Sequence, residues 1–153
     1  MSRTVVCVGA VVRRSDEILL VRQSAGHSLE GRWTIPWGRL GEGESPTLAA
    51  IRETEEESGV TAEVEGLLGV QELPEPWMGM IGMIFICRHV DGEPTPDNRE
   101  TDAARYFNRG ALEECSENLD PLSYWLVSRV FDNRHVLIKP DESNPFCPCA
   151  GYF

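Results

Sequence analysis

The sequence predicts an α/β or α+β sandwich built around one sheet, in a single domain. Short apolar runs rich in Val, Ile and Leu alternate with two segments that carry helix signals. The chain has 153 residues, which is the length of one ordinary domain. Its 41% hydrophobic and 25% charged residues allow a single hydrophobic core under a polar surface.

A β-hairpin is predicted near the start of the chain. Residues 5–12 are nearly all apolar and rich in Val, as in a strand that is buried on both faces. After a polar turn, residues 18–21 form the second strand of the hairpin. Residues 33–36 are then a short extended segment, because Pro36 keeps the residue before it out of helical geometry.

A helix is predicted from Pro46 to about Ser58. Ser45 is a favourable N-cap, and proline is favoured at the first helical position. Gly59 follows the last helical residue, where glycine commonly ends a helix. This helix therefore has a start signal and a stop signal of its own.

The second half of the chain is predicted to supply further strands and one more helix. The helix begins at Asp120–Pro121 and carries apolar residues along one side. The expected strands are residues 60–73, with a kink at Gly66 or Gly69, and residues 80–90, 103–107 and 135–138.

The charge balance limits the class of ligand. Fourteen Lys and Arg residues against 25 Asp and Glu residues give a formal net charge of −11. A non-specific binder of nucleic acid needs a basic face, so a nucleic-acid polymer is not expected as a partner. A small phosphorylated ligand is still allowed if metal ions supply the missing positive charge.

No membrane segment or secretory signal is visible. The longest uncharged run of note, residues 76–87, is too short to span a bilayer. The first residues lack the regions that define a signal peptide. Five cysteines at irregular spacings do not look like a disulfide framework. We therefore expect a reduced, cytoplasmic protein without a membrane partner.

Three carboxylates of the first helix are candidates for a metal site. Glu53, Glu56 and Glu57 stand at positions i, i+3 and i+4, which fall within an arc of ~100° on a helix. Like charges at this spacing repel, and a cation among them would offset the repulsion. Carboxylate oxygens select hard cations such as Mg²⁺, Mn²⁺ or Ca²⁺. The alternative is the ordinary solvated face of a Glu-rich helix.

The segment at residues 38–60, GRLGEGESPTLAAIRETEEESGV, resembles the signature of the Nudix hydrolase family. That signature is G-x5-E-x7-R-E-U-x-E-E-x-G-U, where U is a bulky aliphatic residue. Eight of its nine specified positions match, and Thr54 at the first U is the departure. The resemblance includes the WTIP segment at 33–36 and the ETDAARYF segment at 100–107, and it covers roughly residues 5–131.

The resemblance implies an α/β/α sandwich with a mixed central sheet. The implied Nudix hydrolase domain covers residues 1–139, and residues 140–153 form an irregular tail. The resemblance also implies a site for Mg²⁺ or Mn²⁺, and a structural ion pair between Glu44 and Arg52 that ties a loop to the helix. The implied metal ligands are Glu53, Glu56, Glu57 and the backbone carbonyl of Gly38.

The implied reaction is hydrolysis of a nucleoside diphosphate linked to another moiety, or of a nucleoside triphosphate. The linked moiety could make the substrate a nucleotide sugar, an ADP-ribose-like compound or a CDP-alcohol. A carboxylate accepts the proton of the attacking water. The first candidate for this catalytic residue is Glu53, and the second is Glu100, whose alternative is an exposed loop acid. Asp102 and Glu93 are weaker candidates.

Three residues are candidates for substrate binding. Arg22 and Arg39 lie in segments that the family places near the substrate, where an arginine could hold a phosphate oxygen. The alternative for each is an ordinary surface arginine. Trp37 stands where many Nudix proteins have glycine, and it could stack on a base or pack against Trp33.

Two other functions are compatible with the same residues. One is a noncatalytic Nudix-like domain that binds or senses a nucleotide. The other is a metal-stabilised acidic binding domain without turnover. Metal dependence of hydrolysis separates an active enzyme from both. A homodimer is also compatible, because the apolar residues 80–87 suit either a core strand or an interface.

Overall fold

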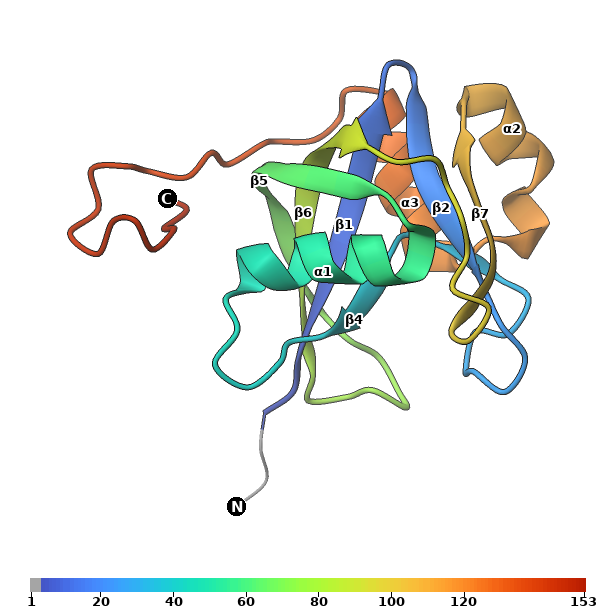
Figure 1. Ribbon diagram of the computed structural model, residues 1–153, viewed down its shortest axis with the longest axis horizontal. Helices are drawn as coiled ribbons and strands as arrows, with labels where there is room; N and C mark the ends of the chain where they lie inside the picture. The colour runs from blue at the N-terminus through green and yellow to red at the C-terminus, as the bar shows by residue number, and fades with distance from the viewer. Residues whose placement is uncertain (1–3) are drawn as a thin grey trace.

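The computed structural model describes residues 4–153, which form seven strands and three α-helices (Figure 1). Residues 1–3 of the predicted domain lie outside the described residues. The strands are β1 (Val6–Arg14), β2 (Glu17–Gln23), β3 (Trp33–Thr34), β4 (Trp37–Arg39), β5 (Thr61–Glu72), β6 (Ile81–Asp91) and β7 (Thr101–Phe107). The helices are α1 (Pro46–Ser58), α2 (Arg109–Glu114) and α3 (Pro121–Phe131), and the 3₁₀ turn Ser116–Asn118 joins the last two.

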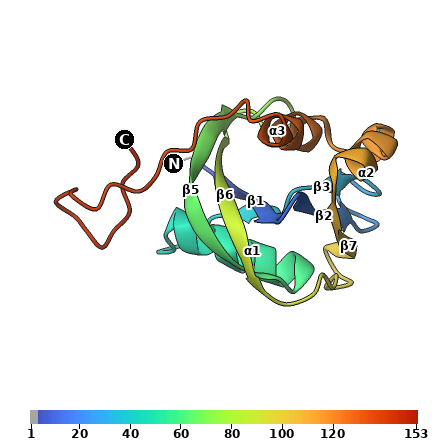
Figure 2. The ribbon, with the colours of Figure 1, turned by 90° about the horizontal axis from the view of Figure 1, so that it is seen from above.

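The strands form one mixed sheet between two helices. Its order is β3-β2-β1-β6-β5, with β4 paired to β1 and β7 paired to β2. The β1–β6 pairing is parallel, and the pairings of the predicted β1–β2 hairpin and of β5 with β6 are antiparallel. Figure 2 shows α1 on one face of these strands and α3 on the other. The predicted α/β/α sandwich with a mixed central sheet is confirmed.

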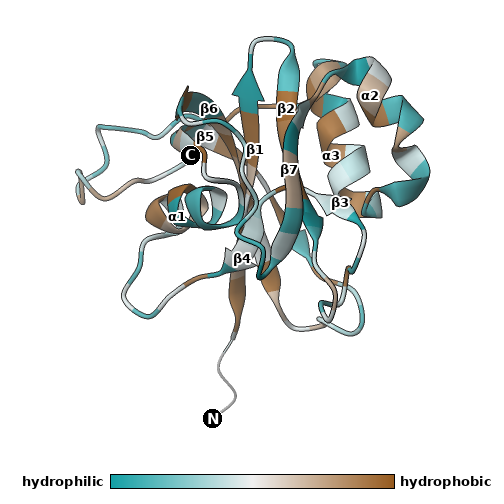
Figure 3. Cartoon of the chain, turned by 45° about the vertical axis from the view of Figure 1, so that its right-hand side comes forward, coloured by the Kyte–Doolittle hydropathy of each residue, from teal (hydrophilic) through white to brown (hydrophobic). Residues whose placement is uncertain are grey.

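The strand β1 lies inside the sheet, and its middle residues are buried on both faces, as its sequence predicts. Alternate side chains of a strand point to opposite faces. Val8 therefore packs in the same cluster as Ala49 of α1, whereas Val11 packs in the cluster that contains Leu126 of α3. Figure 3 shows hydrophobic colour along the middle of β1 and hydrophilic colour at the turn between β1 and β2.

Both ends of α1 carry the predicted signals. The side chain of Ser45 accepts a hydrogen bond from the backbone N–H of Leu48 at 3.3 Å, and Pro46 takes the first helical position. Gly59 has a φ of 69° and donates its N–H to the carbonyl of Glu55. Because this left-handed conformation suits glycine, the chain leaves the helix there and turns into β5.

The loop between β6 and β7 is bound to the C-terminal end of α1. The N–H of Thr95 donates to the carbonyl of Ser58 at 2.7 Å, and the hydroxyl of Thr101 donates to the carbonyl of Glu57 at 2.7 Å. The last carbonyls of a helix have no partner within the helix and need donors from elsewhere. The loop supplies those donors, so the start of β7 is fixed beside the helix.

Strand β4 and helix α2 are short elements that the sequence signals do not predict. Strand β4 has three residues and helix α2 has six, too few to show a clear hydrophobic period. The kink that was expected in β5 at Gly66 or Gly69 is present at both, as shifts in its register with β6. The remaining predicted strands and the helix at Asp120–Pro121 are confirmed within a few residues.

The predicted strand at residues 135–138 is wrong. Within the described residues, this segment pairs with β5 through an isolated bridge between Ile138 and Leu67, with hydrogen bonds of 2.8 and 3.0 Å. Strand β5 changes register at Gly66 and Gly69, on either side of Leu67. Such bulges interrupt the regular ladder that a further strand would need.

The predicted tail, residues 140–153, forms turns and returns to the body of the protein (Figure 1). Pro140 and Tyr152 form an isolated bridge, and the Tyr152 ring lies 5.7 Å from the Phe85 ring between centroids. The boundary of the domain at residue 139 stays a prediction.

The five cysteines carry free thiols. Among residues 4–153, no helix combines the length and the apolar character that crossing a membrane requires.

The contact between β5 and the segment around Ile138 can be tested with two glycines of one strand. A Cβ at Gly66 would lie 2.5 Å from the carbonyl oxygen of Ile138, and a backbone atom cannot rotate away. We expect Gly66→Ala to lower the free energy of unfolding by about 1–3 kcal/mol in urea denaturation, as overpacking does. Gly69→Ala is the control, because a Cβ there meets nothing within 4 Å. Equal effects of the two variants would contradict the packing.

Candidate active site

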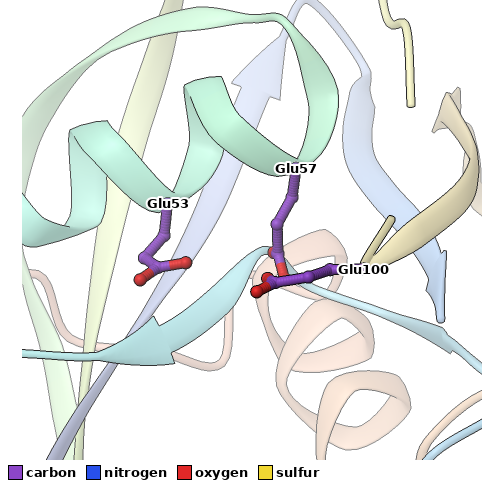
Figure 4. A group of neighbouring side chains, drawn as sticks. All are labelled: Glu53, Glu57 and Glu100. Atoms are coloured by element: carbon purple, nitrogen blue, oxygen red, sulfur yellow. The ribbon is translucent and has the colours of Figure 1, made fainter. Parts of the chain in front are cut away.

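Three carboxylates converge beside the last turns of α1. Glu53 and Glu57 come from the helix, and Glu100 comes from the end of the loop between β6 and β7. One oxygen of each lies within 4.8 Å of the others, and Figure 4 shows the three side chains pointing into the same space. Glu53 and Glu57 are 6% and 2% exposed, so they face the interior, whereas Glu100 is open to solvent.

The surroundings of Glu57 disfavour its negative charge. Burial, together with the neighbouring charges of Glu53 and Glu100, raises the pKa of Glu57 to about 9. The backbone N–H of Trp37 donates to Glu57 at 2.8 Å and opposes this rise only in part. Burial likewise raises the pKa of Glu53. The protein therefore holds two buried acids whose charged forms need compensation.

The donor set fits a hard divalent cation. Ionised carboxylates are costly to bury unless a positive charge lies against them, and oxygen atoms are the ligands that Mg²⁺ and Mn²⁺ prefer. The carboxyl group of Glu53 also lies directly against the backbone of β4, since a Cβ at Gly38 would overlap it. Only glycine allows β4 to approach the helix so closely.

Arg52 links the predicted ion pair to this cluster. Its guanidinium donates twice to Glu44, at 2.7 and 2.9 Å, and once to Glu53 at 2.7 Å. A bidentate pair of this kind fixes direction as well as charge. The hydrogen bonds from Arg52, with the N–H of Gly41, hold the pKa of Glu44 at about 2. The loop before α1 is thus fastened to a carboxylate of the cluster.

Glu56 does not join the other carboxylates. Its side chain is 56% exposed and accepts a hydrogen bond from Arg52 at 3.0 Å. On a helix, Glu57 is ~40° from Glu53 in one direction, whereas Glu56 is ~60° away in the other. The third carboxylate beside Glu53 and Glu57 is therefore Glu100, from a distant part of the chain.

The weaker candidates for proton acceptance are engaged elsewhere. Asp102 forms an ion pair with Arg22 at 2.6 Å, and Glu93 forms one with Arg14 at 3.4 Å. Sequence reasoning missed Asp97, which accepts backbone hydrogen bonds around Glu100. The signal for it was an acid three residues before Glu100, a spacing at which a side chain can accept from a following N–H.

The candidate substrate residues lie in different settings. Arg39 is exposed at the end of β4, next to Gly38. Arg22 is held by its partner Asp102. The ring of Trp37 lies over Gly9 and Gly82, where an added Cβ would meet it at 2.7 and 2.6 Å.

The Trp33 ring, in contrast, packs edge-on against Phe107, with centroids 4.9 Å apart. Trp33, against which Trp37 could have packed, thus has an aromatic partner in Phe107. Trp37 contributes its backbone N–H to Glu57 while its ring covers two glycines.

Two named proteins are similar to this chain over part of their length. The human 8-oxo-dGDP phosphatase NUDT18 is 31% identical over 143 residues, which cover 90% of this chain and 43% of that protein. The ADP-ribose pyrophosphatase of Methanocaldococcus jannaschii is 31% identical over 90 residues, which cover 58% of this chain and 53% of that protein. The chain thus spans about half the length of these curated relatives.

A solved structure shares the fold. The crystal structure of a NUDIX hydrolase from Nitrosomonas europaea matches with a TM-score of 0.78 and 24% sequence identity, over 88% of this chain and 73% of that one. The family model of the NUDIX domain matches residues 3–127, which include the whole of α1 and all seven strands. Because this match covers most of the chain, the protein belongs to the Nudix hydrolase family.

Proposed function

We propose that the protein is a divalent-metal-dependent pyrophosphohydrolase. Its substrate is a small molecule with a nucleoside diphosphate unit, linked to another moiety or carrying a further phosphate. The observation that carries this proposal is the convergence of Glu53, Glu57 and Glu100 at the Nudix signature helix. Two similar proteins are named for activity on 8-oxo-dGDP and on ADP-ribose, and both of these compounds contain a nucleoside diphosphate unit.

Glu53 and Glu57 are the residues that would hold Mg²⁺ or Mn²⁺. A bound cation of this kind neutralises charge on phosphate oxygens and lowers the pKa of the attacking water. Glu53 is oriented by Arg52 and Glu57 by the N–H of Trp37, so both carboxylates are held in place before a ligand arrives. In the sequence signature Glu56 and the carbonyl of Gly38 are further candidate ligands.

Glu100 is the better placed carboxylate to accept the proton of the attacking water. It is exposed, whereas Glu53 is buried and already accepts a hydrogen bond from Arg52. An acceptor must reach the water that faces the substrate, and an oxygen engaged with a guanidinium is a poorer base. Glu53 is the second candidate for this role.

Arg39 and Trp37 support the substrate side of the proposal. Arg39 lies one residue after Gly38, with its side chain open to solvent, where it could bind a phosphate oxygen. Trp37 is partly exposed and could contact a base with its ring. Arg22 could bind a phosphate oxygen only after breaking its ion pair with Asp102.

The proposal is tested by hydrolysis of a nucleotide panel, first with Mg²⁺ and then with Mn²⁺. The panel contains ADP-ribose, 8-oxo-dGDP, nucleotide sugars, CDP-alcohols, dinucleoside polyphosphates and nucleoside triphosphates. Metal-dependent hydrolysis of a member with a nucleoside diphosphate unit is the expected result. Tight metal and nucleotide binding without any turnover would instead favour a sensor domain.

Glu57→Gln should reduce hydrolysis by more than about tenfold, because an amide cannot supply the charge that a divalent cation requires. The fold should be retained, since the amide oxygen can still accept the N–H of Trp37. The rise in melting temperature that Mg²⁺ gives the wild type should shrink in parallel. Glu55→Gln, at an exposed position of the same helix, is the control. An unchanged rate in Glu57→Gln would refute the assignment.

The raised pKa of Glu57 predicts how stability depends on pH without metal. Between pH ~4.5 and ~9 the folded state binds more protons at this group than the unfolded state does, so stability falls as the pH rises. Denaturation in EDTA should therefore give a lower free energy of unfolding at pH 8 than at pH 6. In Glu57→Gln this difference should be smaller. The same difference in both proteins would show that Glu57 ionises freely in the fold.

A further inference from the structure

The loop that carries Glu100 is shaped by one carboxylate, that of Asp97. Oδ1 of Asp97 accepts hydrogen bonds from three consecutive backbone N–H groups, at 2.8, 3.0 and 3.0 Å. The donors belong to Arg99, Glu100 and Thr101. The same oxygen lies 3.3 Å from the Thr101 hydroxyl. A single side-chain oxygen thus fixes the backbone before, at and after Glu100.

The turn closed by Asp97 contains one residue in the left-handed region of backbone conformation. Asn98 has a φ of 58°, which asparagine adopts more readily than most residues with a Cβ. Its N–H donates to the carbonyl of Thr101 at 2.9 Å, which closes the turn from the other side. Together these hydrogen bonds define one backbone conformation for residues 97–101.

The turn is also fixed relative to α1. The Thr101 hydroxyl donates to the carbonyl of Glu57, in the backbone of one of the cluster residues itself. Thr95 anchors the loop to Ser58 at its other end. The position of Glu100 relative to Glu57 therefore depends on the internal shape of the turn, which Asp97 sets.

Electrostatics make such support necessary. Glu100 is held beside Glu53 and Glu57, and repulsion between those of the three carboxyl groups that are ionised opposes this placement of the exposed loop. The three N–H groups that donate to Asp97 stabilise the negative charge of its carboxylate. They also oppose movement of Glu100, because its N–H is one of the three.

We propose that Asp97 is a positioning residue for hydrolysis, which holds the carboxylate of Glu100 against Glu53 and Glu57. This inference rests on the proposed function. Asp97 acts through Glu100 and needs no contact with the substrate. Loss of its carboxylate should lower kcat by releasing Glu100, with little change in KM.

The test compares four variants: Asp97→Ala, Asp97→Asn, Glu100→Gln, and Asp97→Ala combined with Glu100→Gln. Asp97→Ala should lower kcat by about 10- to 100-fold, the scale of a catalytic group displaced by an ångström or so. Asp97→Asn should recover most of the rate, since its amide oxygen can accept the same three N–H groups. The double variant should be no slower than Glu100→Gln alone.

Asp141→Ala is the matched control. Oδ1 of Asp141 also accepts hydrogen bonds within a turn, from the N–H and hydroxyl of Ser143, but in the tail. This variant should leave kcat unchanged. If the losses of Asp97→Ala and Glu100→Gln multiply in the double variant, Asp97 acts independently of Glu100 and the inference is overturned.

Hydrogen exchange gives a readout that does not depend on activity. The N–H groups of residues 99–101 should exchange at least about tenfold faster in Asp97→Ala than in the wild type. Unchanged protection would overturn the inference even if the rate fell. A wild-type protein that hydrolyses no member of the panel would instead overturn the proposed function, and the inference with it.

Discussion

Three carboxylates whose oxygens lie within 4.8 Å of one another, two of them buried, impose the main constraint on this structure. Their mutual repulsion and desolvation have to be offset by the groups around them. Arg52 does so for Glu53, and the N–H of Trp37 does so for Glu57. These local contacts offset the cost only in part, as the raised pKa values of both acids show. A bound divalent cation would offset the rest of the cost of ionising these two acids.

Several parts of the fold serve this constraint. Strand β4 approaches α1 closely because Gly38 has no side chain, and that approach brings the Trp37 N–H to Glu57. Arg52 binds Glu44 in the preceding loop, so the loop cannot move without disturbing Glu53. The site is therefore built into the rigid junction of one helix, one short strand and one loop.

The C-terminal end of α1 has two roles. Gly59 ends the helix, and the free carbonyls of Glu57 and Ser58 then become the attachment points for the loop between β6 and β7. An unsatisfied helix end thus provides the physical link between residues far apart in the chain. The same attachment brings Glu100 to the cluster, which places the most accessible acid beside the two buried ones.

Local signals in the sequence were enough to determine α1, the central hairpin and the class of the site. Ser45, Pro46 and Gly59 act through contacts within a few residues, and the apolar pattern of β1 reflects burial on both faces. The Nudix signature located Glu53, Glu57 and the Arg52–Glu44 pair, because helix geometry and one short loop bring them together.

Only the tertiary structure decided which acids meet. Glu100 rather than Glu56 completes the cluster, because its approach depends on hydrogen bonds between a distant loop and the end of α1. The single bridge at Ile138 depends likewise on bulges in β5, which pairing with β6 sets. Contacts of this kind join residues that are remote in sequence. The sequence therefore offered Glu100 only as one of several candidates, and the folded backbone brings it within reach of Glu53 and Glu57.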